Sequence, residues 1–282
     1  MLGTIAIIGL GLIGGSIAHA LRHSEQVDSV YGYDSCPQAR QWAAELGLAT
    51  VVDEVEQAVR NADLIVLAVP ITAMRSVAET IACCRPPQSV VTDTGSVKTN
   101  IVQELESLFG GHFLGGHPMA GSEHSGPKAS DPNLFRGALY VLTPTETTTV
   151  HARCLTEEMV TLLGAQVINM QKEEHDAKVA TVSHLPHLVA SVLALTTEKQ
   201  GNAHQLAAGG WRDMTRVAAG DERLYAPVLY ANRQALVEVL DLFSEELSAV
   251  RQALVEGQAP LRSRLHQARS FRQLWSRMRG WS

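Results

Sequence analysis

The stretch Thr4-Ile5-Ala6-Ile7-Ile8-Gly9-Leu10-Gly11-Leu12-Ile13-Gly14 decides the fold of this chain. Its first five residues are apolar and mostly β-branched, which is typical of a strand buried in a parallel sheet. Three glycines follow in the spacing Gly-x-Gly-x-x-Gly, and residues 13–22 then have a helical pattern. A strand, a glycine-rich turn and a helix in this order form the context of a dinucleotide-binding fingerprint.

Each glycine of this stretch has a separate predicted task. Gly9 makes the tight turn, Gly11 lets the backbone approach a pyrophosphate, and Gly14 lets the helix pack closely on the strand. The phosphates would bind the free N–H groups at the start of the helix. The predicted cofactor-binding residues here are Gly9, Leu10, Gly11, Leu12, Ile13 and Gly14.

Asp34 ends the next predicted strand, residues 29–33. It follows the glycines by about 20 residues, where a carboxylate would accept a hydrogen bond from the adenine ribose 2′-hydroxyl. A carboxylate at this point repels the 2′-phosphate of NADP, so the sequence favours NAD. The alternative is that Asp34 only caps the loop.

Further strands and helices alternate up to about residue 170. Strands are expected at 63–70, 89–93, 113–114, 138–142 and 166–170, and helices at 37–46, 71–83 and 150–163. The turn at Val69 and Pro70 would lie beside the cofactor. From residue 172 the pattern is helical throughout, and Pro186 should kink a long helix over 175–199. We therefore expect an α/β fold: a Rossmann-type parallel sheet over 1–170, followed by an all-helical domain over 171–282.

Two polar residues follow consecutive predicted strands. Ser96 is expected either as the N-cap of a helix or as a hydroxyl near a reacting centre, and Lys98 as an exposed helix residue. His117 lies in the turn Gly115-Gly116-His117-Pro118-Met119-Ala120-Gly121. Gly116 and Gly121 would allow a close backbone approach or positive φ, and Pro118 keeps His117 out of the α region. His117 is either incidental to a turn or a catalytic histidine.

Composition excludes several classes of function. A net charge of −6 argues against nucleic-acid binding, and 45% hydrophobic residues suit a globular core. We find no apolar run near the ~20 residues of a membrane span and no basic leader. The four cysteines match no metal framework, and reduced cytoplasmic thiols are the default.

With these stretches in hand, the chain resembles the prephenate/arogenate dehydrogenase family of tyrosine biosynthesis. The resemblance spans nearly the whole chain in four parts: residues 9–14 with Asp34, residues 93–98, residues 115–123, and residues 183–186 with 210–216. It implies a helical domain through which two chains form a homodimer. It also implies NAD-dependent oxidation of a 4-hydroxycyclohexadienyl acid with loss of CO2.

The resemblance also implies roles for residues of the site. His117 would take the substrate's hydroxyl proton, and Ser96 would hold the imidazole or that hydroxyl. Arg216 matches the substrate-binding arginine of the family, which can pair with a carboxylate. His184 matches a contact near the substrate's side chain, with a buried core histidine as the alternative. Ser122 and Glu123 match a loop that closes over the substrate.

Prephenate is favoured as the substrate. Arogenate, or the use of both acids, is the alternative, because Glu123 could attract the ammonium group of arogenate. A β-hydroxyacid dehydrogenase is a second enzyme class, but it typically uses a lysine in its helical domain. A cofactor-binding regulator without turnover is a third interpretation.

Overall fold

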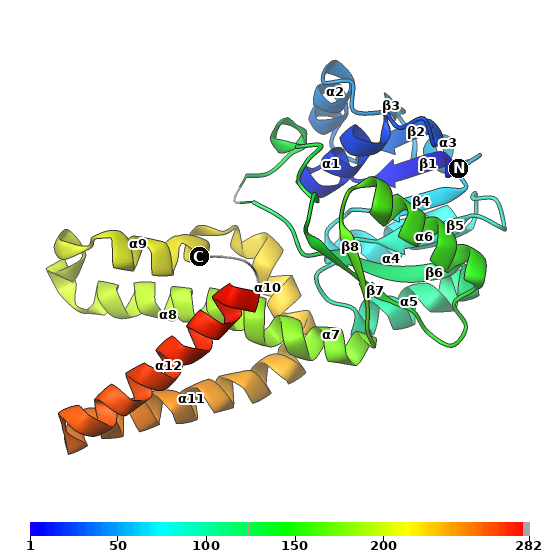
Figure 1. Ribbon diagram of the computed structural model, residues 1–282. Helices are drawn as coiled ribbons and strands as arrows, with labels where there is room; N and C mark the ends of the chain where they lie inside the picture. The colour runs from blue at the N-terminus through cyan, green and yellow to red at the C-terminus, as the bar shows by residue number, and fades with distance from the viewer. Residues whose placement is uncertain (123, 279–282) are drawn as a thin grey trace. The chain divides into compact units, whose positions relative to one another are not determined.

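The computed structural model describes residues 1–122 and 124–278, so the predicted site residue Glu123 lies outside the described part. The chain forms two compact units, Met1–Arg233 and Gln234–Ser282, which are described separately below. The first unit contains the whole sheet and ten α-helices (Figure 1). The second contains the helical segment that follows Arg233.

One eight-stranded sheet organises the first unit, in the order β3-β2-β1-β4-β5-β6-β7-β8. The strands are β1 Gly3–Ile8, β2 Val27–Tyr33, β3 Thr50–Val51, β4 Leu64–Leu67, β5 Val90–Asp93, β6 Phe113–Pro118, β7 Leu139–Thr143 and β8 Gln166–Asn169. All neighbours pair in parallel except β6 and β7, which are antiparallel. The predicted α/β fold with a Rossmann-type sheet is confirmed, with one antiparallel pair at its far side.

Within residues 1–122 and 124–278, twelve α-helices accompany the sheet or follow it. They are α1 Leu12–Leu21, α2 Pro37–Glu45, α3 Val55–Val59, α4 Ile71–Ala82, α5 Thr99–Phe109, α6 Val150–Leu162, α7 Lys172–Val179, α8 Leu185–Lys199, α9 Gly209–Thr215, α10 Glu222–Ala231, α11 Arg233–Glu256 and α12 Gln258–Met278. Short helical turns are η1 Gly110–His112, η2 Pro127–Ala129, η3 Ala180–His184, η4 Gly201–Leu206 and η5 Arg216–Ala219.

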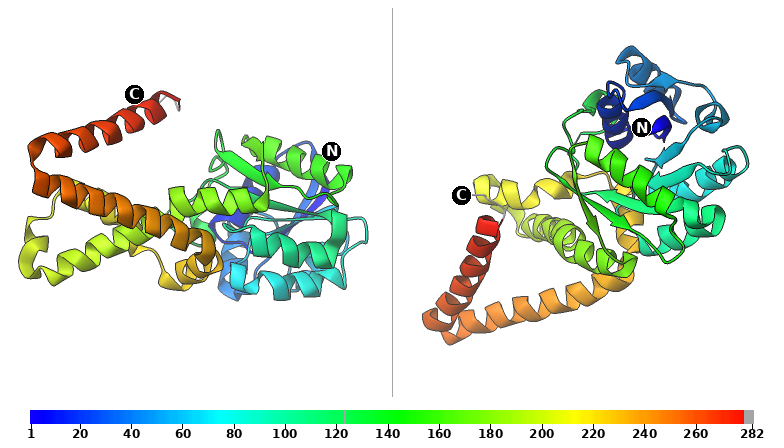
Figure 2. Two further views of the ribbon diagram at one scale, coloured as in Figure 1. Left: turned by 90° about the horizontal axis from the view of Figure 1, so that it is seen from below. Right: turned by 45° about the vertical axis from the view of Figure 1, so that its right-hand side comes forward.

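Helices cover both faces of the sheet (Figure 2), and each face has its own apolar core. One core joins alternate residues of β1 and β4 to α1 and α6, with Ile17 and Met159 fully buried. The other joins the opposite faces of those strands to α3, α4 and α5, with Ile81 and Leu105 buried. Because the strands are buried on both sides, they read in the sequence as continuous apolar runs.

The chain reverses its strand order at β1, which lies between β2 and β4. In such sheets, ligands bind outside the carboxyl ends of the strands at this switch point. The loops after β1, β4, β5 and β6 all emerge at the same edge of the sheet. The fold therefore brings the glycine loop and the predicted catalytic segments to one side.

Several local predictions were wrong. Residues 115–118 are not a turn: they continue β6, and His117 pairs opposite Val141. Gly116 and Gly121 do not have positive φ. A Cβ on Gly116 would instead lie 2.7 Å from the carbonyl oxygen of Asp93, so close strand packing explains this glycine.

The two-residue strand β3 carried no sequence signal. Ser96 is not the cap of α5, because the cap position is Lys98.

The interruption predicted at Pro186 takes the form of a π-helical turn, η3, between α7 and α8. Pro186 follows this turn directly, and its ring and missing N–H are incompatible with a regular α-helical hydrogen-bond ladder at this point. π-Helical turns inside α-helices occur often at functional sites. Here the turn ends at His184.

The expectation that no segment could span a membrane needs a correction. The helix over Lys172–Lys199 is long and apolar enough by composition, with a mean hydropathy of 1.5 over its window. It also carries His175, Asp176 and His184, all buried and hydrogen-bonded to other parts of the first unit. A core helix passes the same compositional test, so the helix is weak grounds for a membrane span.

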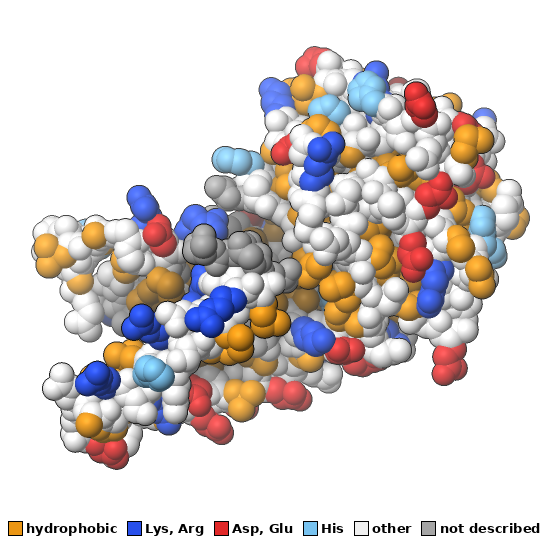
Figure 3. All heavy atoms as spheres, in the orientation of Figure 1, with side chains coloured by type: hydrophobic (Ala, Val, Ile, Leu, Met, Phe, Trp, Pro, Cys, Tyr) orange, Lys and Arg blue, Asp and Glu red, His pale blue; other side chains and the backbone are white. Residues whose placement is uncertain are grey.

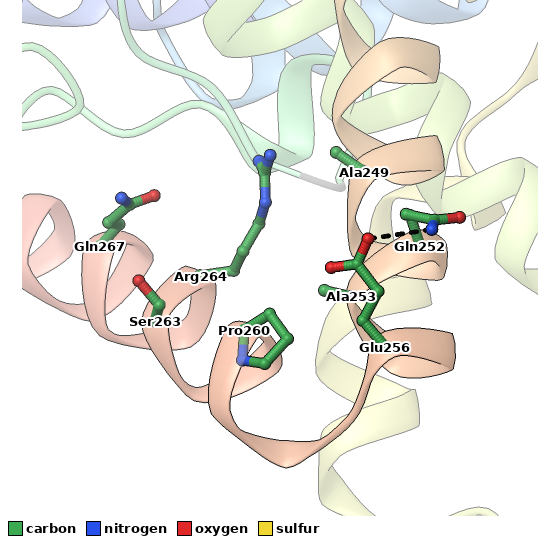
Figure 4. Close-up of a pocket in the computed structure, with 8 residues that line it drawn as sticks. All are labelled: Ala249, Gln252, Ala253, Glu256, Pro260, Ser263, Arg264 and Gln267. Carbon is green, nitrogen blue, oxygen red and sulfur yellow. Dashed lines mark hydrogen bonds between the residues drawn. The ribbon is translucent and has the colours of Figure 1, made fainter.

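In the second unit, α11 and α12 form a hairpin around Gly257, whose φ is +128°. A groove of about 390 Å³ lies between them (Figure 4). Small and polar side chains line this groove, and Arg264 pairs with Glu246 at 2.7 Å. Large apolar side chains are exposed on both helices, including Leu247, Phe271 and Leu274. On α12 they share the surface with basic side chains (Figure 3).

Candidate active site

The glycine loop after β1 has the shape that phosphate binding requires. Gly9 has φ +96°, and a Cβ there would lie 2.4 Å from the carbonyl oxygen of Ala68. A Cβ on Gly14 would lie 1.9 Å from the carbonyl oxygen of Gly9. By contrast, a Cβ on Gly11 would meet open space, on the side from which a ligand can approach. The loop ends at the N-terminus of α1, whose first N–H groups have no carbonyl in the helix to bind.

Asp34 is joined to this loop. One carboxylate oxygen accepts a hydrogen bond from the backbone N–H of Leu10 at 2.8 Å, and the other accepts from Cys36 at 2.9 Å. A carboxylate has about four acceptor positions, so the two oxygens can also accept from ribose hydroxyls. Val69, after β4, lies against the opposite side of the loop, and Pro70 is exposed at the start of α4. These residues form a cradle that fits a dinucleotide.

A buried ion pair lies at the ends of β5 and β6. Lys98 and Asp93 are both completely buried, and the Lys98 ammonium donates to one carboxylate oxygen of Asp93. Gly95 also donates its N–H to Asp93, and Gly116 donates to the second oxygen at 3.1 Å. Burial lowers the pKa of Lys98, and the Asp93 charge opposes this shift. Lys98, expected to be exposed, is instead buried and pairs with Asp93, whose carboxylate joins the loop after β5 to the backbone of β6.

His117 points into a chain of polar groups that begins on α7. Its Nδ1 lies 2.8 Å from Nε2 of His175, and the two rings meet edge to face with centroids 5.1 Å apart. His175 Nδ1 lies 2.8 Å from a carboxylate oxygen of Asp176. His175 is completely buried, and Asp176 is 7% exposed.

Asp176 anchors this chain to α5. Its two carboxylate oxygens accept from the backbone N–H groups of Lys98 at 2.7 Å and Thr99 at 2.8 Å. The carboxylate therefore caps a helix N-terminus, where a negative charge is favoured. Hydrogen bonds from His175, Thr99 and Lys98 lower the pKa of Asp176, against the opposing effect of burial. Asp176 is consequently ionised near neutral pH.

These contacts determine the protons on both histidine rings. An ionised carboxylate only accepts, so Nδ1 of His175 carries a proton and its Nε2 is an acceptor when the ring is neutral. The contact with His117 then requires the proton on Nδ1 of His117. Nε2 of His117 is left with a lone pair. The arrangement can hold His117 ready to accept a proton at Nε2.

The surroundings keep His117 neutral. Burial lowers its pKa well below 6.5, and the neighbouring His175, Lys98 and His184 lower it further. Only Asp176 acts in the opposite direction. A neutral imidazole is the form that can act as a general base.

His184 lies close to this chain and is 3% exposed. Its Nδ1 is 3.1 Å from the side-chain nitrogen of Asn232, which also donates to the backbone carbonyl of Asp176 at 2.8 Å. Among the described residues, its Nε2 has no hydrogen-bond partner although it is buried. Burial lowers the pKa of His184 to about 4.

The other predicted residues are more dispersed. Ser96 is partly exposed in the loop after β5, beside the strand that carries His117. Ser122 is exposed and accepts a hydrogen bond from the backbone N–H of His124. Arg216 is exposed in η5, which packs against α8.

Sequence reasoning missed His175, Asp176 and Asn232, and gave Lys98 no role. His175 and Asp176 are adjacent in a helix and match no spaced motif. They lie among the charged residues of α7, so neither stood out in the sequence as a buried group. Asn232 gave no signal, because its neighbours are ordinary helix residues.

Comparisons with known proteins agree with this geometry. A family model described as "Prephenate dehydrogenase, nucleotide-binding domain" matches residues 17–169, and "Prephenate dehydrogenase, dimerization domain" matches residues 171–268. A cyclohexadienyl dehydrogenase of Zymomonas mobilis is 37% identical over 89% of this chain and 88% of its own length.

Two solved structures are also similar. The Aquifex aeolicus prephenate dehydrogenase in complex with hydroxyphenyl propionate and NAD+ is 31% identical, with a TM-score of 0.91. That match covers 97% of this chain and 98% of the other. Arogenate dehydrogenase from Synechocystis is 32% identical, with a TM-score of 0.84, covering 96% and 99%. Two successive family models and relatives above 30% identity along most of its length show that the chain belongs to the prephenate dehydrogenase family.

Proposed function

We propose that this protein catalyses the NAD-dependent oxidation of prephenate to 4-hydroxyphenylpyruvate, with loss of CO2. The chain from His117 through His175 to Asp176 is the observation that carries the proposal, because it leaves a neutral base at Nε2 of His117. Its position at the carboxyl end of β6, on the same edge as the glycine loop, suits a reaction between a bound dinucleotide and an acid.

The cofactor in this proposal is NAD, which when bound supplies the acceptor for the hydride. Residues 9–14 would hold the pyrophosphate, Val69 and Pro70 would border it, and Asp34 would accept a hydrogen bond from the adenine ribose. The open side of Gly11 and the hydrogen bonds of Asp34 to the loop support this assignment. The Asp34 carboxylate also disfavours the 2′-phosphate of NADP.

His117 removes the proton of the substrate hydroxyl while the hydride leaves the same ring carbon. The new imidazolium is stabilised through its Nδ1–H by His175 and, beyond it, by ionised Asp176. The carbon–oxygen bond becomes a carbonyl. When the ring carboxylate leaves as CO2, the electrons of the broken C–C bond enter the ring, and the oxygen regains a proton as a phenol. Positioning and proton acceptance are the tasks of the protein.

The proposed contacts with the substrate come from the resemblance to the family. Arg216 pairs with a carboxylate, His184 contacts the side-chain end, and Ser96 holds the reacting hydroxyl. Ser122 would contact the substrate from a loop that closes over the site, and the role that the resemblance implies for Glu123 falls outside the described residues. The buried, unpartnered Nε2 of His184 supports its part in this set.

We also propose a homodimer formed through the helices after residue 170, with the functional division of the chain at residues 170 and 171. The dimerization-domain match and the exposed apolar side chains Leu247, Phe271 and Leu274 support it. Sedimentation equilibrium tests it by giving the mass of one or two chains. A cytoplasmic location is supported by the free, exposed thiols of Cys36, Cys83 and Cys154.

NADH formation by the purified protein tests the reaction, with prephenate and arogenate each paired with NAD and NADP. We expect the highest kcat/KM for prephenate with NAD. A higher value for arogenate would make the protein an arogenate dehydrogenase, and preference for NADP would contradict the role of Asp34. NAD binding without turnover of either acid would support a regulator.

A further inference from the structure

Asn232 lies at the C-terminal end of α10 and is 5% exposed. Its side-chain nitrogen makes two contacts, 2.8 Å to the backbone carbonyl oxygen of Asp176 and 3.1 Å to Nδ1 of His184. A carbonyl oxygen can only accept, so the first contact identifies the group facing it as the NH2 of the amide. The orientation of the Asn232 amide is therefore determined by Asp176.

The second contact then determines the proton on His184. An NH2 group only donates, so Nδ1 of His184 must accept and carry a lone pair. His184 is neutral near pH 7, because burial lowers its pKa to about 4. Its single ring proton is consequently on Nε2, the atom that is buried and has no partner among the described residues.

We propose that Asn232 is a positioning residue that fixes His184 as an Nε2–H donor, so that the site favours an acceptor oxygen on the substrate's side chain over an ammonium. This rests on the proposed function, since it names which side chain the same site prefers. A keto oxygen accepts from Nε2–H, whereas an ammonium has no lone pair to accept it. Asn232 therefore favours the keto acid, prephenate, over the amino acid, arogenate.

The backbone of Asp176 links this device to the base. The backbone carbonyl oxygen of Asp176 accepts a hydrogen bond from the Asn232 amide, and its carboxylate accepts one from Nδ1 of His175. One residue thus aligns two rings: His117 as the acceptor for the substrate's hydroxyl proton, and His184 as a donor to its side chain. The two ring nitrogens that face a ligand have opposite polarity, although both rings are neutral.

The tautomer can be measured without any turnover. The nitrogen shifts of 15N-histidine in the full chain separate protonated from unprotonated ring nitrogens, and the signal lost in His184→Gln identifies His184. We expect protonated Nε2 in the wild type and a mixture of tautomers in Asn232→Ala. Protonated Nε2 to the same extent in Asn232→Ala would overturn the role of Asn232.

Kinetics test the consequence. Asn232→Asp is nearly isosteric but replaces the donor by an acceptor, so that the proton of a neutral His184 moves to Nδ1. We expect kcat/KM for prephenate to fall by about tenfold to 100-fold, and the ratio of arogenate to prephenate to rise. If Asn232→Asp does not fold, Asn232→Ser, which is smaller and uncharged, takes its place in the test. We expect Asn232→Ser to lower kcat/KM for prephenate by about tenfold.

Asn61→Asp is the matched control, because Asn61 is exposed and precedes β4 at the opposite edge of the sheet. It should change neither substrate's kcat/KM. A ratio of arogenate to prephenate that stays the same in both Asn232 variants would overturn the specificity role. If the wild type turns over neither acid, the proposed function fails, while the nitrogen shifts still decide the tautomer.

Discussion

The two halves of the candidate site are built in different ways. The cofactor half, residues 9–14 with Asp34, is made from one short segment and the strand that pairs with it. The half around His117 joins this histidine to Asp93 and Lys98 and to His175 and Asp176, from three separate parts of the chain. The first half relies on backbone groups of contiguous residues together with the Asp34 carboxylate, and the second relies on side chains of distant residues. A local motif can therefore encode only the first half.

The largest expected effect is that of His117→Asn, which should impair the chemistry of one half of the site and leave cofactor binding by the other half intact. It removes the base, so kcat should fall by about 10²–10⁴-fold, while NAD affinity stays close to that of the wild type. NADH formation gives kcat, and calorimetric titration gives the NAD dissociation constant.

His151→Asn makes the same change on the exposed surface of α6 and should leave both values unchanged. A fully active His117→Asn protein would remove this histidine from the mechanism.

Lys98→Met should weaken the fold more than the chemistry. The variant leaves the Asp93 carboxylate buried without its cation, so the free energy of unfolding should fall by about 3–5 kcal/mol. Urea unfolding measures the change. Asp93→Asn/Lys98→Met removes both charges and should recover part of the loss. A change below about 1 kcal/mol in Lys98→Met would show that the pair does not hold β5 to β6.

His175→Leu tests whether the base depends on α7. Without an acceptor for its Nδ1–H, His117 should lose its fixed tautomer, and kcat should fall about 100-fold with little change in KM. His175→Gln offers an amide oxygen at a similar distance from the backbone and should restore part of kcat. Equal loss in both variants, or a loss confined to KM, would contradict a positioning role.

Gly11→Ala and Gly14→Ala probe the cofactor half. The Cβ that Gly11→Ala adds meets no protein atom but would occupy space through which the pyrophosphate approaches the loop. NAD should therefore bind about tenfold more weakly, while the melting temperature stays unchanged. The Gly14 Cβ would collide with the Gly9 carbonyl oxygen, so Gly14→Ala should lower the melting temperature as well. Unchanged NAD binding in Gly11→Ala would show that the pyrophosphate lies elsewhere.

The smallest expected effect concerns pH. In the proposed mechanism the neutral form of His117 is the base, and burial together with His175, Lys98 and His184 lowers its pKa well below 6.5. Since protonation begins only near that lowered pKa, kcat/KM should change by less than about twofold between pH 7 and pH 6. An unperturbed histidine would lose about threefold over the same interval. A fall of that size, centred near pH 6.5, would contradict the low pKa.

The sequence alone determined the fold class, the glycine loop and the position of Asp34, because strand periodicity and the Gly-x-Gly-x-x-Gly spacing act through neighbouring residues. It also indicated His117, although it took a strand for a turn. It could not determine the partners of His117 or the burial of Lys98. Those depend on how α7 packs against β6 and α5, which bring residues 58 to 78 positions apart into hydrogen-bonding distance. Those contacts also determine which ring nitrogen of His117 and of His184 carries the proton. Only the tertiary structure could therefore decide these protonation states.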